Sequence, residues 1–244
     1  MTPPARILRD LIRIRSDTGS DMEPVVGYAA DFLKRRGLDV HLFNFGGGAP
    51  CMVARLPGRT RGVPRPLLAL YCHLDTAAFD ASGWRTDPLG AAVLRGRIFG
   101  RGAVDCKGLA AVWMSLLAGR ASGGPDLPFD TALVAVTDEE VQGNAGLEAL
   151  LDRTAELEGA FLALSEGGGF PLNACGRRYY TVQTGEMDEL APGMDGRPLR
   201  PPAFPAALAA GFRLGAFTAE TLGYRVRVFL GGGGERRLAH PPFA

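Results

Sequence analysis

The chain has 244 residues, of which 46% are hydrophobic and 22% are charged, so it has enough apolar side chains for a globular core. Its 27 basic and 26 acidic residues nearly cancel, which leaves no net field to attract nucleic acid or an anionic membrane. We expect a cytoplasmic protein with neither partner, because no apolar run reaches the roughly 18 residues of a membrane span and the first residues lack a signal-peptide pattern.

The first part of the chain predicts two helices followed by three strands. Apolar residues recur at helical spacing over residues 5–15 and 23–36, and Gly37 suits the end of the second helix. Strands are predicted at residues 38–45, 51–56 and 67–72. The third strand, LLALYC, is apolar throughout, as expected of a strand that is buried on both faces.

Strands and helices alternate from there to residue 164. Arg95-Gly96-Arg97 separates two short apolar segments and indicates a hairpin. Helices are predicted at residues 108–117 and 145–157, and strands at residues 131–137 and 160–164. This alternation predicts an α/β fold with a largely parallel sheet flanked by helices.

Acids and one imidazole occur where the predicted strands end. They follow LLALYC, TALVAVT and FLAL, and one acid lies in the glycine-rich loop GRGAVDCKG before a helix. These residues are His73, Asp75, Asp105, Glu139, Glu140 and Glu166. Because ligands bind outside the carboxyl ends of the strands in an open parallel sheet, we expect these side chains to converge.

Gathering several acids in one cleft is unfavourable unless a cation is present, since like charges repel and burial penalises each charge. Carboxylate and neutral imidazole are zinc ligands at about 2.0 to 2.2 Å. Two ions about 3.5 to 4 Å apart need a carboxylate that they share. His73, Asp105, Glu140 and Glu166 are of the right types for such a site.

Each motif also has an ordinary structural explanation. A histidine in HxD can simply end a strand, the acids of DEE can start a solvated helix, and the GRG loop can form a tight turn or an anion nest. A nucleotide site is a poor alternative, because the loop lacks the GxGxxG spacing. The joint occurrence of the motifs at successive strand ends favours the metal site.

YCHLDT, GRGAVDCKG, VTDEEVQGNAG and ALSEGGG, in this order, resemble the dizinc aminoacylase/carboxypeptidase family of metallopeptidases. That family also contains acetylornithine deacetylase and succinyl-diaminopimelate desuccinylase. The resemblance runs from about residue 5 to Glu186. It implies a zinc-exopeptidase-like catalytic domain that holds two Zn²⁺ ions, or Co²⁺, and hydrolyses an amide bond in a small peptide or N-acyl amino acid.

The resemblance also assigns metal ligands. His73 and Glu166 would bind one zinc ion, Glu140 would bind the other, and Asp105 would bridge the two. It further implies that the Asp105–Cys106 peptide bond is cis.

Two further acids would serve the reaction rather than the metals. Asp75 would hydrogen-bond the far nitrogen of His73 and fix its tautomer. Glu139 would act as the general base, taking a proton from the attacking water and returning it to the leaving amine. Cys72 and Cys106 flank the ligands, and we interpret both as small apolar fillers.

The sequence departs from the family pattern after Glu186. We assign residues 1–186 to an incomplete catalytic domain and residues 187–244 to an irregular tail rich in proline and glycine, with a short helix near 206–212 and a strand near 224–230. The family continues into a lid or dimerisation domain and a last zinc-binding histidine. Apart from His73, the chain has only His41, expected to be a surface or half-buried strand residue, and His240, interpreted as a tail residue. The lid domain is therefore expected to be missing.

Two interpretations of function follow. In the family, the lid domain carries a histidine that stabilises the oxyanion of the tetrahedral intermediate. A hydrolase without this donor and without the last zinc-binding imidazole should have weak or no activity, since loss of one such donor costs roughly 10² to 10³ in rate. The alternative is a catalytically inactive remnant that binds metal or a partner. A truncated product, a frame-shifted product and a degenerate relative would all explain the tail. Oligomeric state is left open.

Overall fold

The computed structural model describes residues 2–58, 65–124, 127–141 and 146–166, together with five short strands beyond residue 166. The chain divides into two compact units, residues 1–166 and residues 167–244. The first unit contains every residue that the sequence singles out as a metal ligand or catalytic group.

Four α-helices belong to the first unit: α1 (Pro3–Arg13), α2 (Glu23–Lys34), α3 (Lys107–Ala121) and α4 (Leu147–Arg153). Proline occupies the first turn of α1 and of α2, where its missing N–H costs no hydrogen bond. Helix α4 is shorter than the predicted 145–157. Thr154 leaves the helical conformation, and its hydroxyl donates to the carbonyl of Leu150 at 2.7 Å, which ends the helix.

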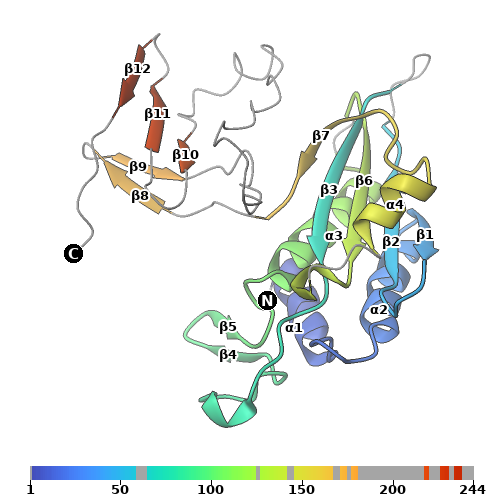
Figure 1. Ribbon diagram of the computed structural model, residues 1–244, viewed down its shortest axis with the longest axis vertical. Helices are drawn as coiled ribbons and strands as arrows, with labels where there is room; N and C mark the ends of the chain where they lie inside the picture. The colour runs from blue at the N-terminus through green and yellow to red at the C-terminus, as the bar shows by residue number, and fades with distance from the viewer. Residues whose placement is uncertain are drawn as a thin grey trace, which may run out of the picture. The chain divides into compact units, whose positions relative to one another are not determined.

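The main sheet has the strand order β1-β2-β6-β3-β7 (Figure 1). Its strands are β1 (Asp39–Phe43), β2 (Cys51–Leu56), β3 (Leu67–His73), β6 (Asp130–Val136) and β7 (Ala160–Leu164). Strand β3 pairs in parallel with β6 and β7, whereas β2 is antiparallel to both β1 and β6. All strands except β2 therefore run in one direction, and the prediction of a largely parallel sheet is confirmed.

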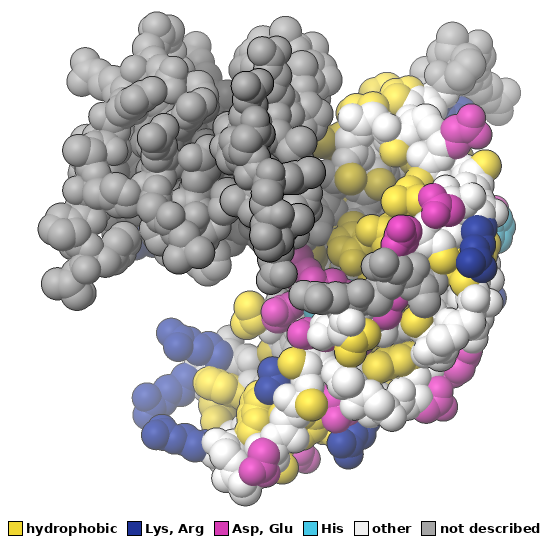
Figure 2. Space-filling view, in the orientation of Figure 1, with side chains coloured by type: hydrophobic (Ala, Val, Ile, Leu, Met, Phe, Trp, Pro, Cys, Tyr) yellow, Lys and Arg dark blue, Asp and Glu magenta, His cyan; other side chains and the backbone are white. Residues whose placement is uncertain are grey.

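Shorter elements complete the first unit. They are the 3₁₀ helices η1 (Ala81–Gly83) and η2 (Glu139–Val141) and the hairpin strands β4 (Ala92–Leu94) and β5 (Arg97–Phe99). The hairpin predicted from Arg95-Gly96-Arg97 is confirmed, since Arg95 (φ 49°) and Gly96 (φ 75°) both adopt the positive φ that a tight hairpin turn needs. Basic side chains gather over this hairpin in the space-filling view (Figure 2).

Helices cover both faces of the main sheet. One apolar cluster joins α1, α2 and α3 to side chains such as Met52 and Leu133, and the other joins Leu150 of α4 to side chains such as Val53 and Val134. This two-sided burial explains why β3 and β6 are nearly continuous apolar runs. No helix among the described residues is long and apolar enough to span a membrane.

In the second unit the described residues form two small antiparallel sheets. Strands β8 (Pro171–Ala174) and β9 (Arg177–Tyr180) form a hairpin, and β10 (Phe217–Ala219), β11 (Val226–Leu230) and β12 (Gly234–Arg237) form a three-stranded sheet. Strand β11 confirms the strand predicted near 224–230. The helix predicted near 206–212 and the residue His240 lie outside the described residues.

Candidate metal centre

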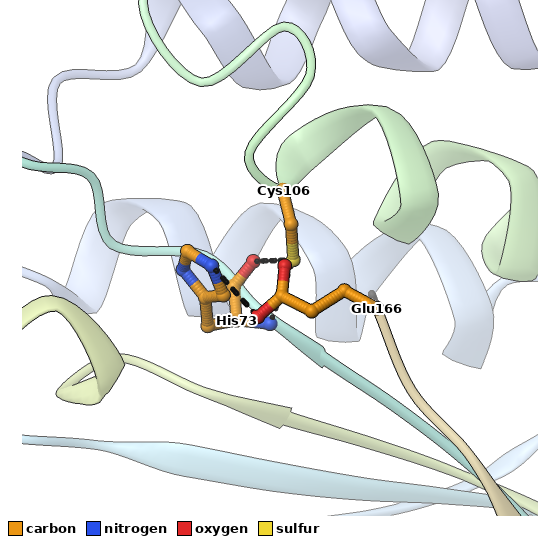
Figure 3. A group of neighbouring side chains, drawn as sticks. All are labelled: His73, Cys106 and Glu166. Atoms are coloured by element: carbon orange, nitrogen blue, oxygen red, sulfur yellow. Dashed lines mark hydrogen bonds and ion pairs between the residues drawn. The ribbon is translucent and has the colours of Figure 1, made fainter. Parts of the chain in front are cut away.

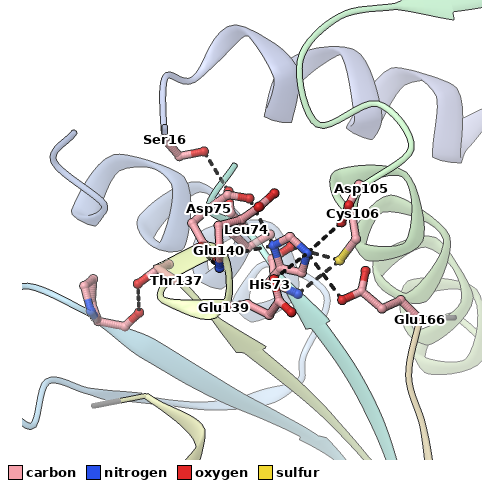
Figure 4. Close-up of polar contacts among 11 residues, drawn as sticks. Ser16, His73, Leu74, Asp75, Asp105, Cys106, Thr137, Glu139, Glu140 and Glu166 are labelled. Carbon is pink, nitrogen blue, oxygen red and sulfur yellow. Dashed lines mark hydrogen bonds and ion pairs between the residues drawn. The ribbon is translucent and has the colours of Figure 1, made fainter. Parts of the chain in front are cut away.

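The carboxyl ends of β3, β6 and β7 bring the predicted site residues together (Figure 4). His73 is the last residue of β3, Glu139 and Glu140 lie on η2 just after β6, and Glu166 follows β7. Asp105 comes from the loop that leads into α3. Segments far apart in the sequence thus supply one cluster, as the strand-end positions predicted.

The imidazole of His73 lies at the centre of the acidic groups. Its Nε2 atom is 2.9 Å from Asp105 Oδ1, 3.4 Å from Glu166 Oε1 and 3.8 Å from Glu139 Oε2. The His73 side chain is fully buried, whereas the Asp105 side chain is 70% exposed. The cluster therefore has a buried base and a rim that solvent and small ions can reach.

Two overlapping groups of side chains could each hold a metal ion. The ligand atoms of His73, Asp105 and Glu140 all lie within 4.8 Å of one another, and so do those of His73, Cys106 and Glu166. Each of the four predicted ligands belongs to at least one of these groups. Asp105 and Glu140 are in the first group, Glu166 is in the second, and His73 is in both. The first of these groups includes the acid that the resemblance treats as a bridge, Asp105.

Asp75 lies behind the imidazole, on the side away from Asp105. Its carbonyl oxygen is 3.1 Å and its Oδ1 atom 3.3 Å from His73 Nδ1, and its Oδ2 atom accepts a hydrogen bond from the Glu140 amide at 2.9 Å. The side chain is buried. Asp75 thus contacts the far nitrogen of His73 and ties the end of β3 to η2.

The segment after α1 supports the end of β3, a contact that the sequence analysis missed. The Ser16 hydroxyl donates to the carbonyl of Leu74 at 2.7 Å, and the Thr76 amide donates to the carbonyl of Ser16 at 2.9 Å. These bonds hold both neighbours of Asp75. No sequence signal pointed to them, because they join segments that lie 58 residues apart.

Lys107 is a second residue that the sequence analysis missed. It is 1% exposed, and its ammonium group donates to the carbonyls of Leu11 and Ile14, at 3.0 and 2.9 Å. Lys107 is the first residue of α3, two positions after Asp105, so it links the metal-site loop to the end of α1. Burial lowers the pKa of Lys107 to about 8, partly opposed by nearby Asp17 and Asp75.

The cluster attracts positive charge. Burial alone would lower the pKa of His73, but polar contacts with Asp75, Cys106 and Glu166 outweigh burial and raise the pKa well above its usual value. The hydrogen bond from His73 lowers the pKa of Glu166 in spite of burial. Burial raises the pKa of Glu139, and the charge of His73 offsets part of that effect. A cation at this place would be stabilised.

The model of the peptidase family M20/M25/M40 matches residues 69–231, more than half of the chain. The chain belongs to this family. The match covers β3 from Ala69 onward, η2, β7 and the residues of the cluster, and it extends past Glu186, where the motif resemblance ended.

Members of the M20/M25/M40 family resemble the chain over part of their length. A succinyl-diaminopimelate desuccinylase from Acidiphilium cryptum is 34% identical over 154 residues, which cover 62% of this chain and 38% of the relative. The beta-Ala-His dipeptidase of Rattus norvegicus is 26% identical over 210 residues, covering 75% of this chain and 42% of the relative.

Solved structures of the family share the fold. Human carnosine dipeptidase 1 matches with a TM-score of 0.56 and 25% identity over 66% of this chain and 38% of its own. The M20 family metallo-carboxypeptidase Sso-CP2 from Sulfolobus solfataricus matches with a TM-score of 0.59 and 23% identity over 69% of this chain and 38% of its own. The chain thus spans about two fifths of the length of these relatives.

Cys106 lies in the same apolar cluster as Cys72, as the interpretation of both as apolar fillers expects, but it also has polar contacts. It is buried, as expected, but its Sγ atom accepts a hydrogen bond from the His73 amide at 3.2 Å and donates one to the His73 carbonyl at 3.3 Å. The thiol therefore has polar contacts with the end of β3. The Asp105–Cys106 peptide bond is cis, as the family resemblance implied. Cys72 does pack in the apolar cluster with α3.

His41 lies on β1, away from the cluster. It is exposed, as predicted, and its ring contacts Glu156 at 2.5 Å and Asp39 at 3.3 Å. Those two contacts raise its pKa, with the Glu156 hydrogen bond as the main cause. These contacts explain the position of the His41 ring without a role in metal binding.

We expect Gly102→Ala to lower the free energy of unfolding more than Gly96→Ala does. Both glycines have positive φ, at +76° and +75°. A Cβ on Gly102 would lie 2.7 Å from Thr76 Cγ2 and 3.1 Å from Lys107 Cδ, whereas Gly96 has open space. The extra overpacking should cost about 1 to 3 kcal/mol, measured by urea unfolding of both variants. Equal losses would contradict the tight fit of this loop in the M20 fold.

Proposed function

We propose that residues 1–166 form the metal-binding part of a hydrolase that cleaves an amide bond in a small peptide or an N-acyl amino acid. One observation carries the proposal: an imidazole and several carboxylates from separate segments gather at the carboxyl ends of three strands. Membership of the M20/M25/M40 family supports it, as do the names of the relatives, a desuccinylase and a dipeptidase.

The chemistry of the donor set fits a divalent cation. Carboxylates this close to one buried imidazole repel one another unless a positive charge lies among them. Asp75 Oδ1 is buried with no hydrogen-bond partner, 3.3 Å from His73 Nδ1. If Nε2 of His73 binds a cation, the remaining ring proton lies on Nδ1 and is directed at Asp75, which satisfies this oxygen.

In this proposal His73 and Glu166 would hold one ion, Glu140 would hold the other, and Asp105 would be shared by the two. The ions would be Zn²⁺, with Co²⁺ as a substitute, because imidazole and carboxylate suit both. Bound ions would supply a Lewis acid for the amide carbonyl and a lower pKa for the attacking water.

The chain's own residues handle the proton. Glu139 lies on the rim, with its side chain 44% exposed and its Oε2 atom 3.8 Å from His73 Nε2. Its pKa is raised, mainly by burial, so it is a stronger base than an ordinary glutamate. It takes the proton of the attacking water and delivers it to the leaving nitrogen, while Asp75 keeps His73 in one tautomer.

Exchanging the two neighbouring glutamates one at a time tests these roles. We expect Glu139→Gln to retain two zinc ions per chain and to lose roughly 10²- to 10⁴-fold in the rate of amide hydrolysis, the usual contribution of a general base. Glu140→Gln should lose one ion. Metal analysis by mass spectrometry and hydrolysis of N-succinyl amino acids and dipeptides measure both effects. Failure of the unaltered chain to bind zinc would refute the proposal.

A catalytically inactive metal-binding remnant is the second candidate. Among the described residues His73 is the only imidazole at the cluster, so the ion held by Asp105 and Glu140 has no imidazole of its own there. The remnant predicts at most one tightly bound ion and no metal-dependent hydrolysis. Two bound ions with hydrolysis would favour the enzyme.

A further inference from the structure

The second group of possible ligands includes a thiol. The ligand atoms of His73, Cys106 and Glu166 all lie within 4.8 Å of one another, and the three side chains point toward a common centre (Figure 3). Of the three cysteines that the structure describes, only Cys106 belongs to such a group. Cys72 and Cys106 both belong to the apolar cluster with α3, but Cys72 is in neither group of possible ligands.

We propose that Cys106 is a ligand of the ion held by His73 and Glu166, so that this position prefers thiophilic divalent ions such as zinc and cadmium. The inference rests on the metal site proposed above and names a donor outside its imidazole and carboxylate set. Thiolate sulfur selects softer ions, whereas carboxylate and water suit magnesium, calcium and manganese.

Charge balance supports the thiol as a ligand. When sulfur donates an electron pair to the ion, the S–H bond breaks and the proton leaves to water. With a neutral His73, the carboxylates of Glu166, Glu140 and Asp105 and the Cys106 thiolate then carry four negative charges, which balance the two divalent ions of the proposed site.

The hydrogen bonds of Cys106 are compatible with this change. The His73 amide, 3.2 Å from Sγ, remains a donor and stabilises a thiolate better than a thiol. The bond that is lost, from Sγ to the His73 carbonyl at 3.3 Å, is a weak one because S–H is a poor donor. The stronger of the two hydrogen bonds is therefore kept when the thiol proton leaves.

Cadmium binding to the full chain tests the proposal. We expect Cd²⁺ to produce an ultraviolet sulfur-to-metal charge-transfer band that Cys106→Ser abolishes and that Cys72→Ser and Cys175→Ser leave unchanged. Cys106→Ser should still bind Cd²⁺, with an affinity lower by at least the ~10- to 100-fold that loss of an outer partner costs.

Each other result is decisive. Cadmium binding without the band, or a band that survives in Cys106→Ser, overturns the role of Cys106 and leaves the carboxylate site intact. Absence of any cadmium or zinc binding overturns the proposed function as well. If Cys106→Ser does not fold, X-ray absorption of the unaltered zinc-loaded chain decides, since one sulfur at about 2.3 Å supports the proposal and a shell without sulfur refutes it.

Discussion

Asp105→Asn is expected to lower the affinity of the chain for zinc by more than about 100-fold. Loss of a residue that only orients a metal ligand already lowers metal affinity by ~10- to 100-fold. Asp105 is proposed to bind both ions directly, so its loss should lower the affinity further. Asparagine keeps the shape of the side chain and removes its charge. Because the Asp105 side chain is 70% exposed and its closest contact is with His73, the fold should be retained.

Asp80→Asn is the matched control for this experiment. Asp80 is also an exposed acid, and its carboxylate accepts hydrogen bonds from the backbone and hydroxyl of Ser82, away from the cluster. Zinc affinity is measured by competition with a chromophoric chelator, and urea unfolding confirms that each variant is folded. If Asp105→Asn binds zinc as tightly as Asp80→Asn does, Asp105 is not a metal ligand.

The sequence predicted most of the first unit because its signals are local. Residues 67–72 and 132–136 are apolar throughout, which indicates buried strands, and proline and glycine mark the ends of α2. The strand order β1-β2-β6-β3-β7 was not predicted, since it depends on which strands meet in space. An apolar run carries no information about its neighbours or its direction.

The candidate site was visible for a related reason. Charged residues directly after an apolar strand are conspicuous, and the rule that the ends of parallel strands share one edge is enough to predict that His73 and Glu166 lie together. Cys106 and Lys107 were missed because their roles depend on partners far away. Lys107 bonds to a carbonyl 96 residues earlier, and Cys106 to a residue 33 positions earlier.

The pH dependence of stability should reveal the burial of Lys107. Burial lowers its pKa in the folded protein to about 8, below the ordinary lysine value of 10.5. Between these two values the unfolded chain binds a proton that the folded protein has released. The Lys107 contribution to the free energy of unfolding therefore rises with pH across this window, by about 3 kcal/mol in total, and is constant below pH 8.

Lys107→Met removes this contribution while keeping the length of the side chain. We expect the difference in free energy of unfolding, unaltered chain minus Lys107→Met, to rise by about 3 kcal/mol between pH 8 and pH 10.5 in urea titrations with chelator present. Cys51 and Tyr28 have raised pKa values, about 11 and about 12, caused mainly by burial. They lower stability over this range in both proteins, so they cancel in the difference.

The chain's other lysine provides the control. Lys34 is exposed at the end of α2, so Lys34→Met controls for the replacement of a lysine by methionine away from the metal-site loop. If the difference between the unaltered chain and Lys107→Met does not change with pH, the hydrogen bonds from Lys107 to the carbonyls of Leu11 and Ile14 offset the effect of burial on its pKa. In that case the link between the metal-site loop and α1 is a charged hydrogen bond at every pH below about 10, and its loss in Lys107→Met should cost about 1.5 to 3 kcal/mol throughout that range.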